Sequence, residues 1–164
     1  MQMTSNEVLD EEQSSAKDVK VLQAVLSDLD LIAPLFDGYR QFYGRPTDIS
    51  AARAFLLERF NHGESVLFIA YSGTVPVGFT QLYPSFSSVS LARIFVLNDL
   101  FVSEYARKKG VAKKLINAAT DYAKFMGAVR VSLSTSVNNQ TAQAVYESSG
   151  WKRDEQFFYY HFVI

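Results

Sequence analysis

The spacing of apolar and polar residues predicts strands and helices along nearly the whole chain. Short runs rich in apolar, β-branched and aromatic residues favour strands, whereas apolar residues three or four positions apart favour helices. We expect strands over residues 19–25, 65–71, 75–83, 90–102 and 129–137, and a terminal hairpin over 151–164. We expect helices over residues 27–43, 50–61, 110–127 and 138–149. The order βααβββαβαββ indicates an α/β domain with mixed layers.

Polar residues mark the ends of several of these elements. Ser27 and Asp28 offer oxygens that can cap the first helix, and Ser50 is expected to cap the second. Residues 1–18 are polar and acidic and lack a clear period. We therefore expect a polar leader over residues 1–18, followed by one domain over residues 19–164.

The composition excludes several classes of function. The chain is 48% hydrophobic and 20% charged, and its net charge of −1 argues against nucleic acid or a membrane as a partner. It has no cysteine, which excludes disulfides, thiolate metal sites and a cysteine acyl intermediate. His62 and His161 are isolated, so we expect no metal. Because we find neither a signal-peptide pattern nor an apolar run of the roughly 20 residues that span a bilayer, we expect a cytoplasmic protein.

An apolar strand that runs through a short polar loop into a helix carries the first candidate chemistry. The loop ends at Gly110, and the backbone N–H groups of a first helical turn have no acceptor inside the helix. Such a turn is a ready site for an anion, and Gly110 with Ala112 leaves room for a phosphate to approach. Basic residues surround it: Arg107, Lys108, Lys109, Lys113 and Lys114. The alternative is a basic helix start with a glycine turn, since the pattern is neither a P-loop nor a G-x-G-x-x-G turn.

A second motif follows the next predicted strand. Asn139 stands at the head of a short helix, Tyr146 lies two turns further along it, and Gly150 and Trp151 end it. Taken alone, Asn139 could be a simple N-cap and Tyr146 a core aromatic.

The two motifs, in this order and spacing, resemble those of the GNAT superfamily of acetyl-CoA-dependent N-acetyltransferases. The resemblance covers residues 19–164 and is strongest over 97–151. Arg107, Gly110 and Ala112 match the pyrophosphate signature Q/R-x-x-G-x-G/A. The resemblance implies a single-domain fold with a mixed, mostly antiparallel sheet and helices on both of its faces. It also implies acetyl-CoA as the acyl donor, direct transfer to an amine, no metal, and a homodimer.

The resemblance also assigns residues to the acyl donor. One strand is expected to splay from its neighbour so that the pantetheine arm lies along it. Tyr146 would protonate the departing thiolate. The residues expected to contact acetyl-CoA are Leu100, Phe101, Val102, Arg107, Lys108, Lys109, Gly110, Val111, Ala112, Lys113, Asn139 and Tyr146.

Asp99 is the candidate general base. An amine with a pKa near 10 is mostly protonated at pH 7, so a group must take its proton before it can attack. Asp99 precedes the residues expected to contact the thioester, and we expect it to act through water. The alternative is a strand-end carboxylate bonded to backbone. Residues 97–102 and 38–43 look like the polyamine, diamine and histone-type branch, although Asn98 stands where polyamine enzymes usually carry an acid.

The acceptor is expected to bind between the first two helices and the region of residues 83–86. Tyr39, Tyr43 and Tyr83 would line this site together with Asp99, and Asp37 or Asp48 would attract a cation. The leading hypothesis is acetylation of a primary amine on a small molecule. Two alternatives stay open: acetylation of protein lysines or N-termini, and a module that binds acyl-CoA as a sensor without turnover.

Overall fold

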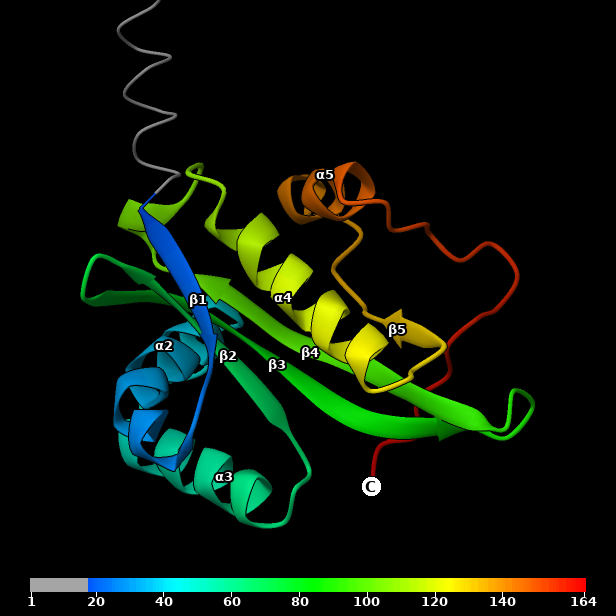
Figure 1. Ribbon diagram of the computed structural model, residues 1–164, viewed down its shortest axis with the longest axis horizontal. Coiled ribbons are helices and arrows are strands. Elements are labelled where there is room, and N and C mark those ends of the chain that lie inside the picture. Colours follow the sequence, from blue (N-terminus) through cyan, green and yellow to red (C-terminus); the bar gives the residue numbers. More distant parts are fainter. Residues whose placement is uncertain (1–17) are drawn as a thin grey trace, which may run out of the picture. The chain divides into compact units, whose positions relative to one another are not determined.

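The computed structural model describes residues 18–164, so nearly all of the expected leader lies outside the described residues. Within the described residues the chain falls into two compact units, residues 18–134 and 135–164. The strands of the first unit are β1 Val19–Gln23, β2 Val66–Ser72, β3 Val75–Ser87, β4 Ala92–Val102 and β5 Arg130–Ser132 (Figure 1). Its helices are the short η1 Leu26–Asp28 and η2 Glu104–Ala106, with α2 Leu29–Phe42, α3 Ile49–Asn61 and α4 Val111–Phe125.

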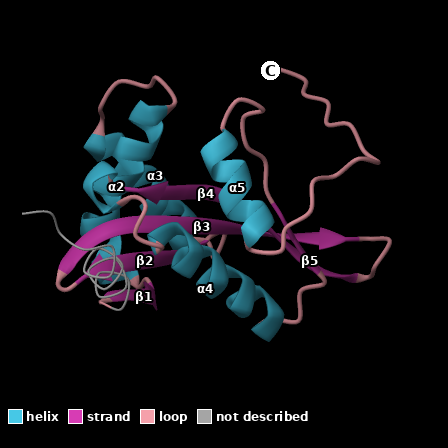
Figure 2. Cartoon of the chain, turned by 90° about the horizontal axis from the view of Figure 1, so that it is seen from above, coloured by secondary structure: helices cyan, strands magenta, loops and turns pink. Residues whose placement is uncertain are grey.

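The strands form one sheet in the order β1-β2-β3-β4-β5. The first four are antiparallel neighbours, and β5 runs parallel to β4, which confirms the mixed, mostly antiparallel sheet. Successive side chains of a strand point to opposite faces. On β2, Leu67 and Ile69 join the core formed with α2 and α3, whereas Phe68 packs 5.8 Å from Tyr122 of α4. The helix pair and α4 therefore cover opposite faces of the sheet (Figure 2).

The core of the first unit lies between the sheet and the pair α2–α3. Its most deeply buried members come from helices and strands alike: Leu29, Ile32, Ala33, Ala52, Leu56, Leu67, Ile69 and Phe79. Apolar burial of this kind is the main favourable term in folding, and it fixes α2 against β3 and β4 and α3 against α2.

A β-bulge interrupts the pairing of β3 with β4. Gln81 is the partner of Asp99, but the next pair joins Leu82 to Leu97, so Asn98 has no partner of its own. An extra residue bends a strand and shifts its later side chains to the other face.

Because of the bulge, odd-numbered residues of β4 point to one face of the sheet before Asn98 and to the other face after it. Before it, Phe95 packs 5.8 Å from Tyr122 of α4. After it, Phe101 packs against the core on the side of α2 and α3, although both positions are odd-numbered. Asp99 consequently lies on the α2 side of the sheet.

The strand predicted over residues 129–137 is shorter than expected. β5 pairs only Arg130, Val131 and Ser132 with residues 94–96 of β4. Among the described strands, none continues beside residues 97–102 on that side of β4. Residues 133–137 form no backbone pairing with β4, so the regular strand ends at Ser132.

Two further predictions are corrected by the structure. Ser50 is not the cap of α3, because the carboxylate of Asp48 accepts the bond from the Ala51 N–H at 2.9 Å. In the second unit, α5 spans Gln140–Ser148, but the described residues 151–164 contain no strand, so the predicted hairpin is wrong. Its apolar residues suit a strand, but a strand needs a backbone partner, and none pairs with this segment. Within the described residues, every helix is too short or too polar to cross a membrane.

Candidate functional site

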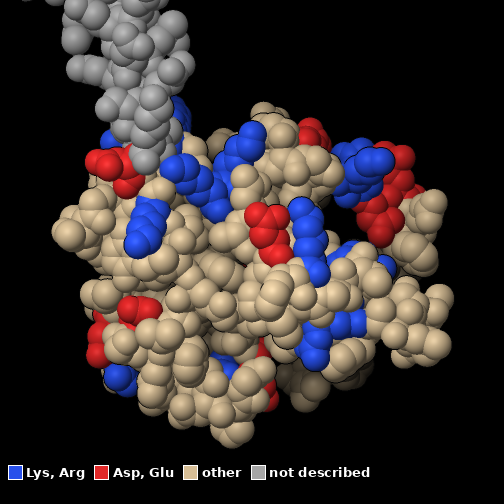
Figure 3. Space-filling model, in the orientation of Figure 1, with Lys and Arg blue, Asp and Glu red and all other residues tan. Residues whose placement is uncertain are grey.

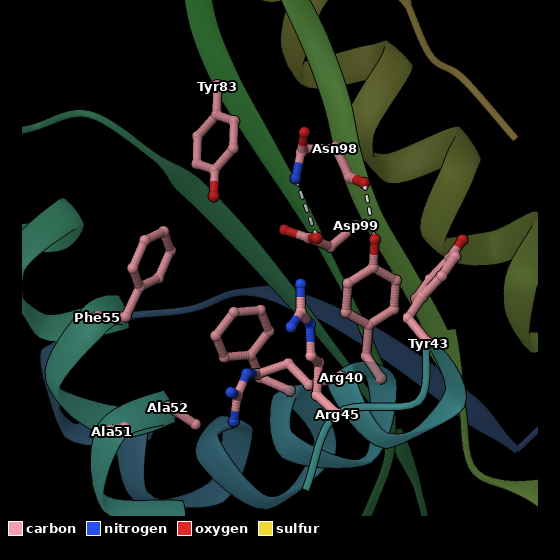
Figure 4. A pocket seen from close by; sticks show the side chains of 11 residues that line it. Arg40, Tyr43, Arg45, Ala51, Ala52, Phe55, Tyr83, Asn98 and Asp99 are labelled. Carbon is pink, nitrogen blue, oxygen red and sulfur yellow. Dashed lines mark hydrogen bonds between the residues drawn. The ribbon is translucent and has the colours of Figure 1, made fainter. Parts of the chain in front are cut away.

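A pocket with a volume of about 530 Å³ opens between α2, α3 and the middle of the sheet. It is lined by Phe36, Tyr39, Arg40, Tyr43, Arg45, Ala51, Ala52, Phe55, Tyr83, Asn98 and Asp99 (Figure 4). Five of the eleven lining residues are aromatic, and the charged ones are Asp99, Arg40 and Arg45. This combination of size and lining is typical of a small-molecule site.

Asp99 is the buried acid of this pocket, with only 2% of its surface exposed. Its carboxylate accepts hydrogen bonds from the Gln81 Nε2 at 2.6 Å and from the Asn98 Nδ2 at 3.1 Å. Burial raises the pKa of Asp99, and the hydrogen bonds from Gln81 and Asn98 oppose that rise without cancelling it. A carboxyl with a raised pKa is a stronger base than an exposed one, which suits it to accept a proton.

Two tyrosines flank the carboxylate. The Tyr39 hydroxyl donates to the Asn98 carbonyl at 3.3 Å, and the Tyr83 hydroxyl accepts from the Gln81 Nε2 at 3.0 Å. Burial, together with the charge of Asp99, raises the pKa of Tyr83 to about 12 and that of Tyr39 further still. Both phenols therefore keep their protons at neutral pH and serve as hydrogen-bonding groups, which leaves Asp99 as the base lining the pocket.

The structure brings together all four residues predicted to line the acceptor site: Tyr39, Tyr43, Tyr83 and Asp99. The two carboxylates expected to attract a cation do not line this pocket. Asp37 is buried, and its carboxylate accepts bonds from Thr47 and Asp48 in the loop after α2. The carboxylate of Asp48 caps α3.

Three polar residues of the site were not foreseen from the sequence. Gln81 could have been noticed as a buried amide within an apolar strand, whereas Arg40 and Arg45 carry no signal that separates them from surface charges.

The start of α4 has the features of an anion site. Gly110 is its N-cap, with φ of +74°, and a Cβ built there would meet no atom within 4 Å. The glycine offers no side chain to cap the helix, so the N–H groups of the first turn, at Val111, Ala112 and Lys113, point out of the helix end. Lys108, Lys109 and Lys113 are exposed there, and Figure 3 shows basic side chains gathered over this end of α4. The geometry fits a phosphate group.

Arg107 has a different environment from the lysines beside it. Its Nε donates to the Val102 carbonyl at 3.0 Å, and its guanidinium lies 5.9 Å from the centre of the Phe101 ring. It therefore ties the loop to the end of β4. Leu100 and Phe101 are half-buried and Val102 is buried, on the part of β4 that lacks a strand partner on the β5 side. An edge of this kind suits an extended chain laid along it.

The other predicted residues belong to the second unit. The Asn139 side chain caps α5 by accepting from the Ala142 N–H at 3.1 Å. The Tyr146 ring lies 6.0 Å from the ring of Trp151. The roles of Asn139 and Tyr146 toward acetyl-CoA stay predictions.

Comparison with known proteins gives consistent results. The sequence model of the Acetyltransferase (GNAT) family matches residues 32–151. YhfO, an N-acetyltransferase of Bacillus subtilis, is 46% identical over 142 residues, which cover 87% of this chain and 95% of that protein. A probable acetyltransferase of Haemophilus influenzae is 33% identical over 135 residues, 82% of this chain and 90% of that one. The crystal structure of a probable acetyltransferase, 46% identical, superposes with a TM-score of 0.84 over 88% of this chain and 97% of that chain.

Proposed function

Since the chain belongs to the GNAT family of acetyltransferases, we propose that it acetylates the primary amine of a small molecule bound beside Asp99. As a member of this family it is an acetyl-CoA-dependent N-acetyltransferase. The proposal of a small-molecule acceptor rests on the pocket of about 530 Å³, which is lined by aromatic residues and one buried acid. A protein substrate would need a shallow open groove instead.

Acetyl-CoA supplies an acetyl group activated as a thioester, and two regions of the chain suit its binding. The first turn of α4, with Gly110 and the lysines around it, would hold the pyrophosphate. The open part of β4 at Leu100, Phe101 and Val102 would bind the pantetheine arm through backbone groups. Backbone N–H groups fixed by a sheet are also suitable donors to a carbonyl oxygen that gains negative charge.

The reaction removes one proton from the acceptor nitrogen and returns one to the departing sulfur. We assign the first proton to Asp99, directly or through water, because its raised pKa makes it the strongest base lining the pocket. Gln81 and Asn98 hold the carboxylate in place, and Tyr39 and Tyr83 can bind the acceptor through their hydroxyl groups. The second proton is assigned to Tyr146 on the basis of the sequence motif. Cytoplasmic location stays a prediction of the sequence.

The test is amine-dependent release of the CoA thiol from acetyl-CoA. We expect release with small primary amines, and slower release with basic peptides.

Asp99→Asn should lower kcat/KM roughly 10²–10⁴-fold at neutral pH and less at high pH, where more of the amine arrives already deprotonated. Rates that differ by one constant factor at every pH would make Asp99 structural. Binding of acetyl-CoA without release in any mixture would favour the sensor, and preferred acetylation of peptides would favour a protein substrate.

A further inference from the structure

Two arginines line the pocket, both from the end of α2 and the loop after it. Arg40 lies in the last turns of α2, and Arg45 lies in the loop that leads to α3. Figure 4 shows both of them among the aromatic side chains of this wall. The sequence predicted carboxylates on this side of the site, so the structure reverses the expected sign of charge.

The two arginines differ in what already binds them. The Arg40 Nη1 donates to the Asp37 Oδ1 at 3.3 Å, so its charge is partly balanced within α2. Arg45 is exposed, and its guanidinium has no ion pair or hydrogen bond to any residue that the structure describes. A guanidinium presents five N–H donors in a planar fork that matches a carboxylate. The Arg45 guanidinium is therefore available to bind an anionic group of a ligand in the pocket.

The loop that carries Arg45 is held in position by Asp37. This carboxylate, with only 1% of its surface exposed, accepts bonds from the Thr47 hydroxyl at 2.7 Å and from the Asp48 N–H at 2.8 Å. Burial raises the pKa of Asp37, but these bonds and that from Gln41 outweigh it, so its pKa lies below the usual value. Asp37 is thus ionised at neutral pH, and its oxygens accept bonds both from this loop and from residues of α2. The anchored loop reduces the cost of ordering Arg45 when a ligand binds.

The charges that face the pocket are therefore one buried acid, Asp99, and two arginines. A polyamine that placed one ammonium at Asp99 would bring a second positive charge toward Arg40 and Arg45, where like charges repel. An amine that also carries a carboxylate matches both parts of the site. Its nitrogen lies beside Asp99, and its carboxylate lies against the guanidinium groups.

We propose that the acceptor is a small primary amine bearing a carboxylate, which Arg45 binds with the help of Arg40. This inference rests on the proposed acetyl transfer and names its substrate class. It places di- and polyamines among the poor acceptors of this chain.

The experiment compares acceptors with and without an anionic group, namely amino acids with their carboxamides and phosphoethanolamine with ethanolamine, and adds a diamine. Rates of thiol release should give a kcat/KM for each amino acid that is roughly 10- to 100-fold above that for its carboxamide, the value of a charge-assisted hydrogen bond. Arg45→Ala should bring this ratio close to one, and Arg45→Lys should leave an intermediate ratio, since it keeps the charge without the fork. Calorimetry should show weaker binding of the N-acetyl amino acid to Arg45→Ala.

Arg53→Ala is the matched control. Arg53 lies on α3 and pairs with Asp30, and it does not line the pocket, so its loss removes the same charge from the same helix pair. The acid-to-amide ratio should stay unchanged in this variant.

Several results would overturn the proposal. Equal rates for acid and amide, or a faster diamine, would refute the anionic acceptor while acetyl transfer itself stands. A preference that survives both Arg45→Ala and Arg40→Ala would place anion recognition elsewhere. If phosphoethanolamine is preferred over ethanolamine but amino acids are not preferred over their carboxamides, the proposed carboxylate on the acceptor is refuted. Failure of every amine to release thiol would refute the proposed function and this inference with it.

Discussion

Asp99 is buried beside two tyrosines, and its burial makes the stability of the protein depend on pH. Burial raises the pKa of its carboxyl group above the unfolded value of about 3.9. Well below this unfolded pKa the group is neutral in both states and carries no cost. As the pH rises through the folded pKa, the folded state must ionise a buried group, so this contribution to stability is lost.

Asp99→Asn should therefore stabilise the protein increasingly as the pH rises above 4, until the difference levels off above the folded pKa of Asp99. Each unit of pKa shift corresponds to about 1.4 kcal/mol, which is roughly 3–6 °C in the Tm of a chain of this size. The measurement is the Tm of both proteins across this pH range by calorimetry. A difference in Tm that is the same at every pH would contradict the raised pKa.

Tyr146→Phe should keep the ring against Trp151 but remove the proton donor. We expect kcat to fall roughly 10²–10⁴-fold while the affinity for acetyl-CoA stays the same. Tyr122→Phe is the matched control, because its ring packs between Phe68 and Phe95 on the α4 face. An unchanged kcat in Tyr146→Phe would reduce this tyrosine to a packing residue.

At the scale of single residues, the sequence predicted the acidic and aromatic lining of the pocket better than its basic part. Asp99 is conspicuous because it interrupts an apolar strand, and Tyr39 and Tyr43 because they fall at helical spacing. Arg45 lies in an irregular loop, and its position depends on the bonds that Asp37 makes across that loop. Local sequence carries no sign of these bonds, which use the Asp37 carboxylate, while the Asp48 carboxylate caps α3.

The start of α4 can be tested against the other end of the same helix. Gly110 and Gly127 both have positive φ, +74° and +71°, so valine is strained at either position. Gly110→Val should raise the KM for acetyl-CoA roughly 10- to 100-fold, because its side chain also stands where the phosphate approaches. Gly127→Val should lower the Tm to a similar extent and leave this KM unchanged. Equal KM values in the two variants would refute the phosphate site.

At the scale of elements, periodicity located the helices and the first four strands but not the irregularities. The bulge at Asn98 arises from the register between β3 and β4, which no local pattern records. The early end of β5 and the missing terminal hairpin have a related cause, because a strand is defined by its partner. The cap at Asp48 was missed because Ser50, a residue type equally suited to capping, stands two positions further along.

A homodimer is the prediction that belongs to the whole molecule. Seven of the last eight residues are apolar or aromatic, and each of them is at least 73% exposed: Phe157, Phe158, Tyr159, Tyr160, Phe162, Val163 and Ile164. An apolar segment of this length is rarely left in water. We expect light scattering to give twice the mass of one chain, and a chain truncated after Gln156 to give the monomer. A monomeric full-length chain would contradict the dimer, and a truncated dimer would contradict the role of this segment.

The extra residue in β4 has a consequence for comparing this chain with its relatives. The face of the sheet from which the Asp99 carboxylate projects depends on the number of residues in β4 at the bulge, not on which amino acids they are. Removal of Asn98 alone would restore a regular ladder and turn Asp99, with the residues that follow it in β4, to the opposite face, although no other amino acid of the strand changes. A gap of one position in an alignment at Asn98 would therefore mark a protein whose acceptor chemistry differs, even where the aspartate itself is aligned.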